Sequence, residues 1–299
     1  MKIQQFLQSR LFNLVKNESL PSLVWGIILA GLFVVLYQDT FYELMHQWDT
    51  NIYYGHGYLM LPLAAWLLWR KRVTLRQLPT GSSWSGLFFL VPGLVLFAVG
   101  FRAEIIFLQG LSFILVLAGG IHTLWGRRAL REATFPLFIL IFMLPLPYLL
   151  LDPIGFPMKQ SAAGQATSLL QLLGVPVWQD GVYLHLPNYT LVVEDACNGL
   201  RSLISIVTVS TVLTHIILPN YRDRVLLIAV SVPISLGANI VRIAMTALMG
   251  YYVSDQLAQG FLHELSGLFV FLLSLGGLLV VVRVILWRRE LVMLRSLSA

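Results

Sequence analysis

Residues 225–248, VLLIAVSVPISLGANIVRIAMTAL, form an apolar stretch that contains a single charged residue, Arg242. Its length fits an α-helix that crosses a bilayer, which needs about 20 mostly apolar residues. The rest of the chain has the same character, since 58% of its residues are hydrophobic, 11% are charged and the mean hydropathy is +0.79. About a quarter of the residues in a soluble domain are charged. The composition therefore excludes a soluble globular protein and predicts a polytopic membrane protein.

Similar apolar stretches extend this prediction to an all-α fold with about eight transmembrane helices. The expected spans are residues 22–37, 57–69, 85–101, 104–125, 134–151, 200–218, 225–248 and 263–287. We expect residues 1–299 to form a single integral membrane domain. The segments outside the spans include a cytoplasmic N-terminal segment (1–21), an extracytoplasmic insertion (152–199) and a cytoplasmic tail (288–299).

The basic residues gather on one side of this predicted topology. The sixteen of the 20 lysines and arginines on that side are Lys2, Arg10, Lys16, Arg70, Lys71, Arg72, Arg76, Arg127, Arg128, Arg131, Arg222, Arg224, Arg283, Arg288, Arg289 and Arg295. Because basic loops stay in the cytoplasm, both termini are predicted to be cytoplasmic. The bias reports topology, and the chain has no basic domain free of spans, so nucleic-acid binding is not expected.

The insertion before the sixth span contains two kinds of local pattern. In residues 157–174, PMKQSAAGQATSLLQLLG, the apolar residues Ala162, Ala166 and Leu170 share one helical face. This spacing predicts a helix that lies along the extracytoplasmic membrane surface. Residues 181–194, GVYLHLPNYTLVVE, alternate in β fashion around a Pro-Asn pair and predict a short β-hairpin. The hairpin would lead the chain to the mouth of the sixth span.

The only cysteine, Cys197, follows this hairpin in the stretch EDACNGLRSL at residues 194–203. We expect Asp195 to cap a helix that begins directly after it, so that the helix dipole and Arg201 favour the thiolate. Glu194 and Asp195 oppose that effect, and the direction of the thiol pKa stays open. The alternative is an inert, buried cysteine. One cysteine excludes a disulfide framework and a cysteine-cluster metal site, and we expect no metal and no cofactor.

Two more residues are expected near the outer leaflet. Arg242 lies about six residues from the outer end of its span, roughly 9 Å deep at the rise of an α-helix. An arginine at mid-helix costs about 2.5–3.5 kcal/mol, so a partner is expected, and Asn239 lies on the same face. His263 opens the eighth span. A thiol nucleophile needs a base, and an oxyanion needs a fixed cation. Alternatively, Arg242 is a snorkelling residue and His263 is structural.

The chain resembles the exosortase/archaeosortase family in the order of its motifs. These are ACNGLR around Cys197, NIVR with Asn239 and Arg242, and HELSG with His263 and Gly267. YGHG at residues 54–57, which contains His56, also fits the family. Asn198 stands where the family usually has a serine, which leaves the subfamily open. The resemblance covers most of the chain.

This resemblance implies a membrane cysteine transpeptidase without a cofactor. Family substrates carry a C-terminal sorting signal made of a short motif such as Pro-Glu-Pro, one transmembrane helix and a basic tail. By resemblance Cys197 would form a thioester, His263 would be the base and Arg242 would stabilise the oxyanion. The supporting residues are Arg201, Asn239, Glu194, Asn198 and His56, and the division of roles between Arg201 and Arg242 stays open.

The resemblance also implies where the protein works and with which partners. The partners would be sorting-signal proteins, the surrounding membrane lipid, and a glycan or a lipid-linked molecule that accepts the acyl group. Transfer to water instead would be plain proteolysis. The implied location is the inner membrane of an exopolysaccharide-producing bacterium, with the site facing the periplasm.

Two other classes of protein fit parts of the sequence. In an exporter or permease for polysaccharide or lipid, Arg242 and the proline-containing spans would line a substrate path. The chain shows no internal repeat, however, and its candidate polar residues lie near one leaflet instead of the midplane. A scaffold for other envelope proteins is the third interpretation.

Overall fold

The computed structural model describes the backbone of residues 19–78, 81, 83–253 and 261–297, and side chains within 28–78, 81, 83–195, 197–253 and 266–290. Most of the expected N-terminal segment and the last two residues of the expected tail lie outside these ranges. The chain divides into two compact units, residues 1–46 and 47–299. The single domain expected from the sequence stays a prediction.

Helix α2 (Ser19–Thr50) accounts for the described part of the first unit and ends in the second. The sequence predicted a span over residues 22–37, but the helix continues for thirteen more residues. Residues 38–50 contain neither proline nor glycine, so nothing in them ends a helix.

The second unit is mostly helical, with one small sheet. Its helical elements are α3 (Gly57–Arg70), α4 (Arg72–Gln77), η1 (Trp84–Gly86), α5 (Leu87–Arg102), α6 (Ile106–Ile139), η2 (Leu140–Met143), α7 (Tyr148–Leu172), η3 (Asp195–Cys197), α8 (Leu200–Ile217), α9 (Tyr221–Tyr252) and α11 (Phe261–Leu297). Its strands are β1 (Trp178–Asp180), β2 (Tyr183–Leu186) and β3 (Tyr189–Val192).

Six helical segments in the described ranges are long and apolar enough to cross a membrane. They are Ile28–Thr50, Trp84–Arg102, Ile106–Met143, Leu200–Ile217, Tyr221–Tyr252 and Ser266–Glu290. The expected span at 57–69 corresponds to α3, which has only 14 residues. Most of the expected spans 104–125 and 134–151 falls within one 38-residue segment, interrupted at Gly126 by non-helical backbone with φ 82° and ψ 177°. The number eight therefore stays a prediction.

Helix α7 begins inside the range that was expected to form the fifth span. Pro145 and Pro147 separate η2 from α7, because proline lacks the N–H that an uninterrupted helix would need. The expected surface helix forms the C-terminal part of α7. Its apolar face is buried at Ala162, Ala166 and Leu170, which agrees with the spacing in the sequence.

The sheet is antiparallel in the order β1-β2-β3. Strands β2 and β3 pair from Tyr183 opposite Val192 to Leu186 opposite Tyr189, and β1 adds a strand that the sequence did not predict. The buried side chains of the sheet share one apolar cluster with α7, Cys197 and α9. The sheet and two helices thus enclose the segment that carries the cysteine.

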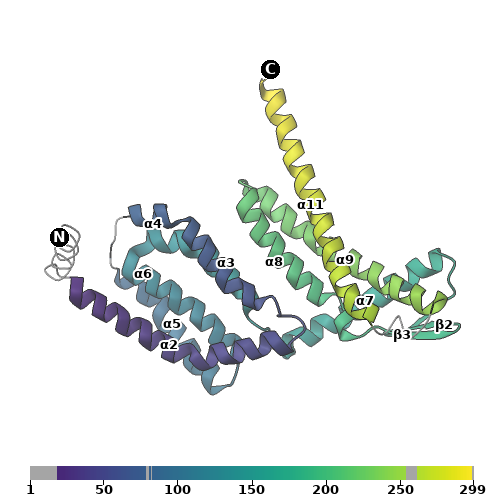
Figure 1. The fold of residues 1–299 in the computed structure, drawn as a ribbon, viewed down its shortest axis with the longest axis horizontal. Helices are drawn as coiled ribbons and strands as arrows, with labels where there is room; N and C mark the ends of the chain where they lie inside the picture. The colour runs from purple at the N-terminus through teal and green to yellow at the C-terminus, as the bar shows by residue number, and fades with distance from the viewer. Residues whose placement is uncertain (1–18, 79–80, 82, 254–260, 298–299) are drawn as a thin grey trace, which may run out of the picture. The chain divides into compact units, whose positions relative to one another are not determined.

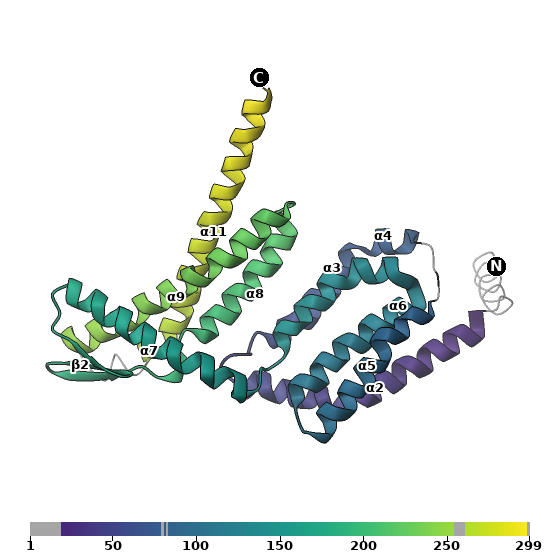
Figure 2. The same cartoon turned by 180° about the vertical axis from the view of Figure 1, so that it is seen from behind.

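Two groups of helices pack within this unit. Helices α8, α9 and α11 contact one another, and α7 contacts α9 (Figure 1). Helix α5 lies along α6 (Figure 2), and glycines permit their close approach. A Cβ added at Gly93 would lie 2.9 Å from Val116, and one added at Gly119 would lie 2.6 Å from Leu90. Small residues at such contacts are typical of membrane helices.

Trp48 and the YGHG segment (residues 54–57) form hydrogen bonds with the end of η2 and the segment after it. The indole of Trp48 donates to the Met143 carbonyl at 2.8 Å, and His56 Nε2 lies 3.1 Å from the Phe142 carbonyl. The Leu146 N–H donates to the Tyr54 hydroxyl at 3.0 Å. Carbonyls at a helix end have no partner within the helix, and these side chains supply partners. Burial lowers the pKa of His56, which keeps its ring neutral, with Nε2 as the donor.

A substitution at Gly57 tests the packing of Trp48 against the end of η2. A Cβ at Gly57 would lie 2.3–2.6 Å from the Trp48 indole, whereas one at Gly55 has its nearest neighbour at 3.8 Å. We expect Gly57→Ala to displace the indole from Met143 and to destabilise the protein by about 1–3 kcal/mol, as overpacking does. The matched control, Gly55→Ala, should leave the Tm of the detergent-solubilised protein close to that of the wild type. Equal Tm values for the two variants would contradict this packing.

Candidate active site

Cys197 lies in a short connection between the sheet and α8. It is the last residue of η3, and α8 begins at Leu200. The expectation that Asp195 caps the helix is wrong. The N-cap of α8 is Gly199, and the Asp195 carboxylate pairs with Lys159 of α7 at 2.6 Å. The thiol thus precedes the first turn of α8 instead of lying within it.

Gly199 gives this connection its shape. Its φ of 84° lies in the left-handed region, where a residue with a Cβ is strained. A Cβ would also lie 3.0 Å from Nδ2 of Asn239. Both the backbone and the space around it therefore require glycine directly before α8.

Asn198, next to the cysteine, is buried and uses both ends of its amide. Its Oδ1 accepts a hydrogen bond from the Leu200 N–H at 2.8 Å, which satisfies a donor at the start of α8. Its Nδ2 donates to the Tyr53 hydroxyl at 3.0 Å. The residue thus fixes the turn and links it to the segment before α3.

Asn239 holds the connection from the other side. It is 2% exposed in the middle of α9, and its Nδ2 donates to the Cys197 carbonyl at 2.8 Å. The sequence suggested that Asn239 orients Arg242, but this bond goes to the cysteine backbone. A buried carbonyl that loses its donor costs about 1–3 kcal/mol, so this bond strongly restricts where Cys197 can lie.

Arg242, one turn after Asn239 on α9, reaches the next helix. It is 8% exposed, and its Nε donates to Ser266 Oγ of α11 at 2.8 Å. Ser266 was not among the residues predicted for the site. Its spacing could have indicated it, because it follows His263 by three residues and so lies about one turn further along the same helix.

His263 belongs to the first turn of α11, but its side chain lies outside the described residues. The place of its backbone in α11 nevertheless limits where the residue can lie. Ser266 follows after a rise of about 4.5 Å along the helix, and Ser266 contacts Arg242. The first turn of α11 therefore begins close to the cluster that α9 and the Cys197 connection form.

The remaining predicted residues have other surroundings. Arg201 is exposed at the start of α8. Glu194 is exposed, and its carbonyl accepts from the Cys197 N–H at 2.9 Å. His56 binds the Phe142 carbonyl at the end of η2, as described above. The structure thus gathers Cys197, Asn198, Asn239, Arg242 and Ser266, and places His56 in a separate set of contacts.

The surroundings assign a direction to the thiol pKa that the sequence left open. Burial has the largest effect and raises the pKa of Cys197. The Arg242 guanidinium lowers it, and the Glu194 carboxylate raises it further. The resting thiol is therefore protonated at neutral pH, and any reaction through the thiolate needs a base.

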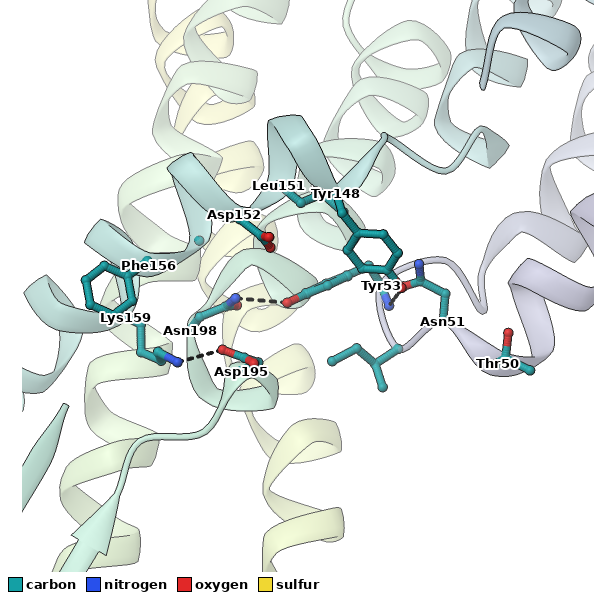
Figure 3. A pocket seen from close by; sticks show the side chains of 12 residues that line it. Thr50, Asn51, Tyr53, Tyr148, Leu151, Asp152, Phe156, Lys159, Asp195 and Asn198 are labelled. Atoms are coloured by element: carbon teal, nitrogen blue, oxygen red, sulfur yellow. Dashed lines mark hydrogen bonds and ion pairs between the residues drawn. The ribbon is translucent and has the colours of Figure 1, made fainter. Parts of the chain in front are cut away.

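A cavity of about 570 Å³ adjoins the connection (Figure 3). It is lined by residues 50–53, the first half of α7, and Asp195 and Asn198, which flank Cys197. The Lys159–Asp195 ion pair and the Asn198–Tyr53 hydrogen bond both lie at this cavity. In the part of the chain that the structure describes, no three or more His, Cys, Asp and Glu residues are grouped to hold a metal ion.

Comparison with known proteins identifies the family. A family model described as transmembrane exosortase matches residues 48–280. The match covers most of the chain, which therefore belongs to the exosortase family. No curated protein and no solved structure matches the chain. Membership and the long apolar helices together establish a multi-pass membrane protein.

The thiol pKa leads to a prediction for alkylation by iodoacetamide. We expect the rate at Cys197 to rise with pH and its midpoint to lie above that of a free cysteine, because burial raises the pKa. Glu194→Gln should move the midpoint down, and Arg242→Gln should move it up. Both shifts should change the rate at pH 8 severalfold, as measured by mass spectrometry.

Arg201→Gln is the matched control for this experiment, because Arg201 is the exposed arginine close to the cysteine in sequence. Its midpoint should equal that of the wild type. A midpoint that moves with Arg201 and not with Arg242 would contradict the electrostatic assignment.

Proposed function

We propose, from membership of the exosortase family and the geometry around Cys197, that the protein is a membrane cysteine transpeptidase. Its substrates would be exported proteins with a C-terminal sorting signal consisting of a short motif, a transmembrane helix and a basic tail. The observation that supports this most directly is that α9 contacts both other parts of the site. Asn239 holds the Cys197 backbone, and Arg242, one turn later, contacts α11.

Cys197 is the proposed nucleophile. Its sulfur would attack the carbonyl carbon of the scissile peptide bond, and the thiol proton would pass to the leaving amine through a base. The raised pKa of Cys197 makes that base necessary. A rigid connection supports such an attack. Hydrogen bonds fix the Cys197 carbonyl and the Asn198 side chain, and Gly199 fixes the backbone that follows them.

Arg242 is the proposed partner of the oxyanion. Its burial strengthens electrostatic interactions, since little water competes for the guanidinium. The hydrogen bond from Nε to Ser266 fixes the plane of the group. The lowering effect of Arg242 on the pKa of the Cys197 thiol supports this role. Arg201 is exposed and less suited to this role.

His263 is the proposed base and, after the attack, the acid that protonates the leaving amine. The support is its position in the turn of α11 that precedes Ser266. The acyl group on Cys197 would then pass to an envelope glycan or a lipid-linked acceptor, or to water in plain proteolysis. Asn198, Asn239 and Glu194 would act by shaping the connection and its charge.

The proposed setting follows the distribution of charge. Eight spans, with the basic loops inside, would place both termini in the cytoplasm. The connection at Cys197 and the sheet would then face the periplasm from the inner membrane. Helix α7 would carry its exposed polar face toward that compartment.

The central test is to trap the thioester. The full chain is incubated with a tail peptide that contains the sorting motif, and the acyl adduct on Cys197 is sought by mass spectrometry. We expect an adduct with the wild type and none with Cys197→Ala. Arg242→Gln should slow adduct formation by about 100-fold or more, the usual cost of losing one oxyanion partner.

The matched controls are Arg201→Gln for Arg242 and His185→Ala for His263, because Arg201 lies at the start of α8 and His185 in β2, both close to Cys197 in the chain. These should retain activity within a few-fold, whereas His263→Ala should lose it. The proposal fails if Cys197→Ala still processes a co-expressed tail protein, and the two arginine roles are exchanged if Arg201→Gln is the slower variant.

Orientation has its own test. In a Cys197→Ala background, single cysteines are introduced at the exposed positions Ser168 in α7 and Val73 in α4. A membrane-impermeant maleimide should label Ser168→Cys in intact spheroplasts and Val73→Cys only after lysis. The reverse pattern would place the site on the cytoplasmic side.

A further inference from the structure

The cavity beside the cysteine has walls of two kinds. Tyr148 and Phe156 of α7 line it, yet their side chains are 63% and 57% exposed. The Lys159 ammonium lies over the Phe156 ring, 5.8 Å from its centre, so the ring of Tyr148 offers the more open apolar face on which a flat, partly apolar ligand can stack. Figure 3 shows both rings at the edge of the same hollow. The volume, about 570 Å³, lies within the usual range for small-molecule sites.

The polar wall provides hydrogen-bonding groups without a free positive charge. Lys159 is neutralised by Asp195, with which it forms an ion pair at 2.6 Å. Asp152 also lines the cavity, its charge acts on Tyr53, and no hydrogen bond or ion pair joins it to another residue drawn in Figure 3. Its carboxylate can therefore accept hydrogen bonds from a ligand. With two carboxylates and one lysine, the wall does not suit a phosphate or another anion.

Two residues near Asp152, Tyr53 and Asn51, can supply hydrogen-bond donors to a ligand. The Tyr53 hydroxyl accepts a hydrogen bond from Asn198, and burial raises the pKa of Tyr53, so its proton stays available for donation. Asn51 lines the cavity, and its Oδ1 accepts from the Tyr53 N–H at 3.0 Å. That bond leaves the NH₂ group of Asn51 able to donate. A ligand with several hydroxyl groups and an apolar ring face would match both walls.

We propose that this cavity binds a saccharide and presents one of its hydroxyl groups to the acyl group on Cys197. This rests on the proposed function, because it makes the saccharide the acceptor of the transfer. Cys197 is not itself a lining residue, but Asp195 and Asn198, which are close to it in the chain, are. A ligand in the cavity would therefore contact the connection that carries Cys197, and the proposal requires one of its hydroxyl groups to reach past Asn198 to the thioester.

The transfer balances without an added reagent. The saccharide oxygen bonds to the acyl carbon, the carbon–sulfur bond breaks, and its electron pair stays on the Cys197 sulfur. The hydroxyl proton passes to the base, proposed above to be His263, and then to the sulfur. The products are a saccharide ester and the free thiol.

The test measures binding, not transfer. The full chain with Cys197→Ala is placed in phosphatidylcholine nanodiscs, because sugar-based detergents would compete for the cavity. Saturation-transfer NMR is recorded with methyl glucoside, methyl galactoside and methyl N-acetylglucosaminide. We expect saturation of the ring protons of at least one of them, with millimolar affinity. Tyr148→Ala or Asp152→Asn should weaken that binding about fivefold or more, because stacking or hydrogen bonds are lost.

Two matched controls are available. Tyr221→Ala removes a tyrosine that is 79% exposed at the start of α9, and Asp180→Asn removes an exposed carboxylate in β1. Both should bind like the parent chain. The proposal is overturned if no saccharide is saturated, if the control variants weaken binding as much as the cavity variants, or if a tail peptide displaces the saccharide by occupying the cavity itself.

The outcome is independent of the thioester test, because Cys197→Ala cannot form the adduct. Saccharide binding without a thioester on the wild type would retain this site and reject the proposed function. A second arm adds monoglucosyl diacylglycerol to the nanodiscs. Competition by this glycolipid would indicate a lipid-linked saccharide, and its absence would indicate a free one.

Discussion

The hydrogen bond from Asn239 Nδ2 to the Cys197 carbonyl is the contact on which the candidate site depends. It joins α9 to the end of the short helix η3, directly before α8. Because both groups are buried, water cannot replace either partner when the bond breaks. Gly199 permits this contact, since any larger residue would meet the Asn239 side chain. The position of the cysteine therefore follows from the position of α9.

The same helix determines the second half of the site. Arg242 lies one turn from Asn239 on α9 and reaches Ser266 of α11. A buried arginine is costly in a membrane unless it is paired, and its bond to Ser266 offsets part of that cost. Arg242 also favours the thiolate at a site where burial opposes it. In this account α9 is the support that brings a sulfur, a guanidinium and the first turn of α11 together.

The parts that the sequence predicted well are those that depend on local periodicity. The shared face of Asn239 and Arg242 follows from helical spacing, and so does the buried face of α7. The parts it missed depend on contacts between distant residues, such as Asn198 with Tyr53, which are 145 residues apart. The expected span at 134–151 is split at Pro145 and Pro147 between η2 and α7. The prediction missed this break because hydropathy averaged over a window does not detect a local interruption of the helix. The expected span at 200–218 agrees with α8, but the expected cap at Asp195 was wrong, because that carboxylate pairs with Lys159, which is 36 residues away in the chain.

The most direct measurement asks whether the first turn of α11 lies against Cys197. The variant His263→Cys contains two thiols, and dibromobimane becomes fluorescent when its two arms bridge a close pair. The account predicts bridging in this variant and single labelling in Leu268→Cys, an exposed position further along α11. Single labelling of both thiols in His263→Cys, with no bridge, would contradict the proposal that these residues form one site.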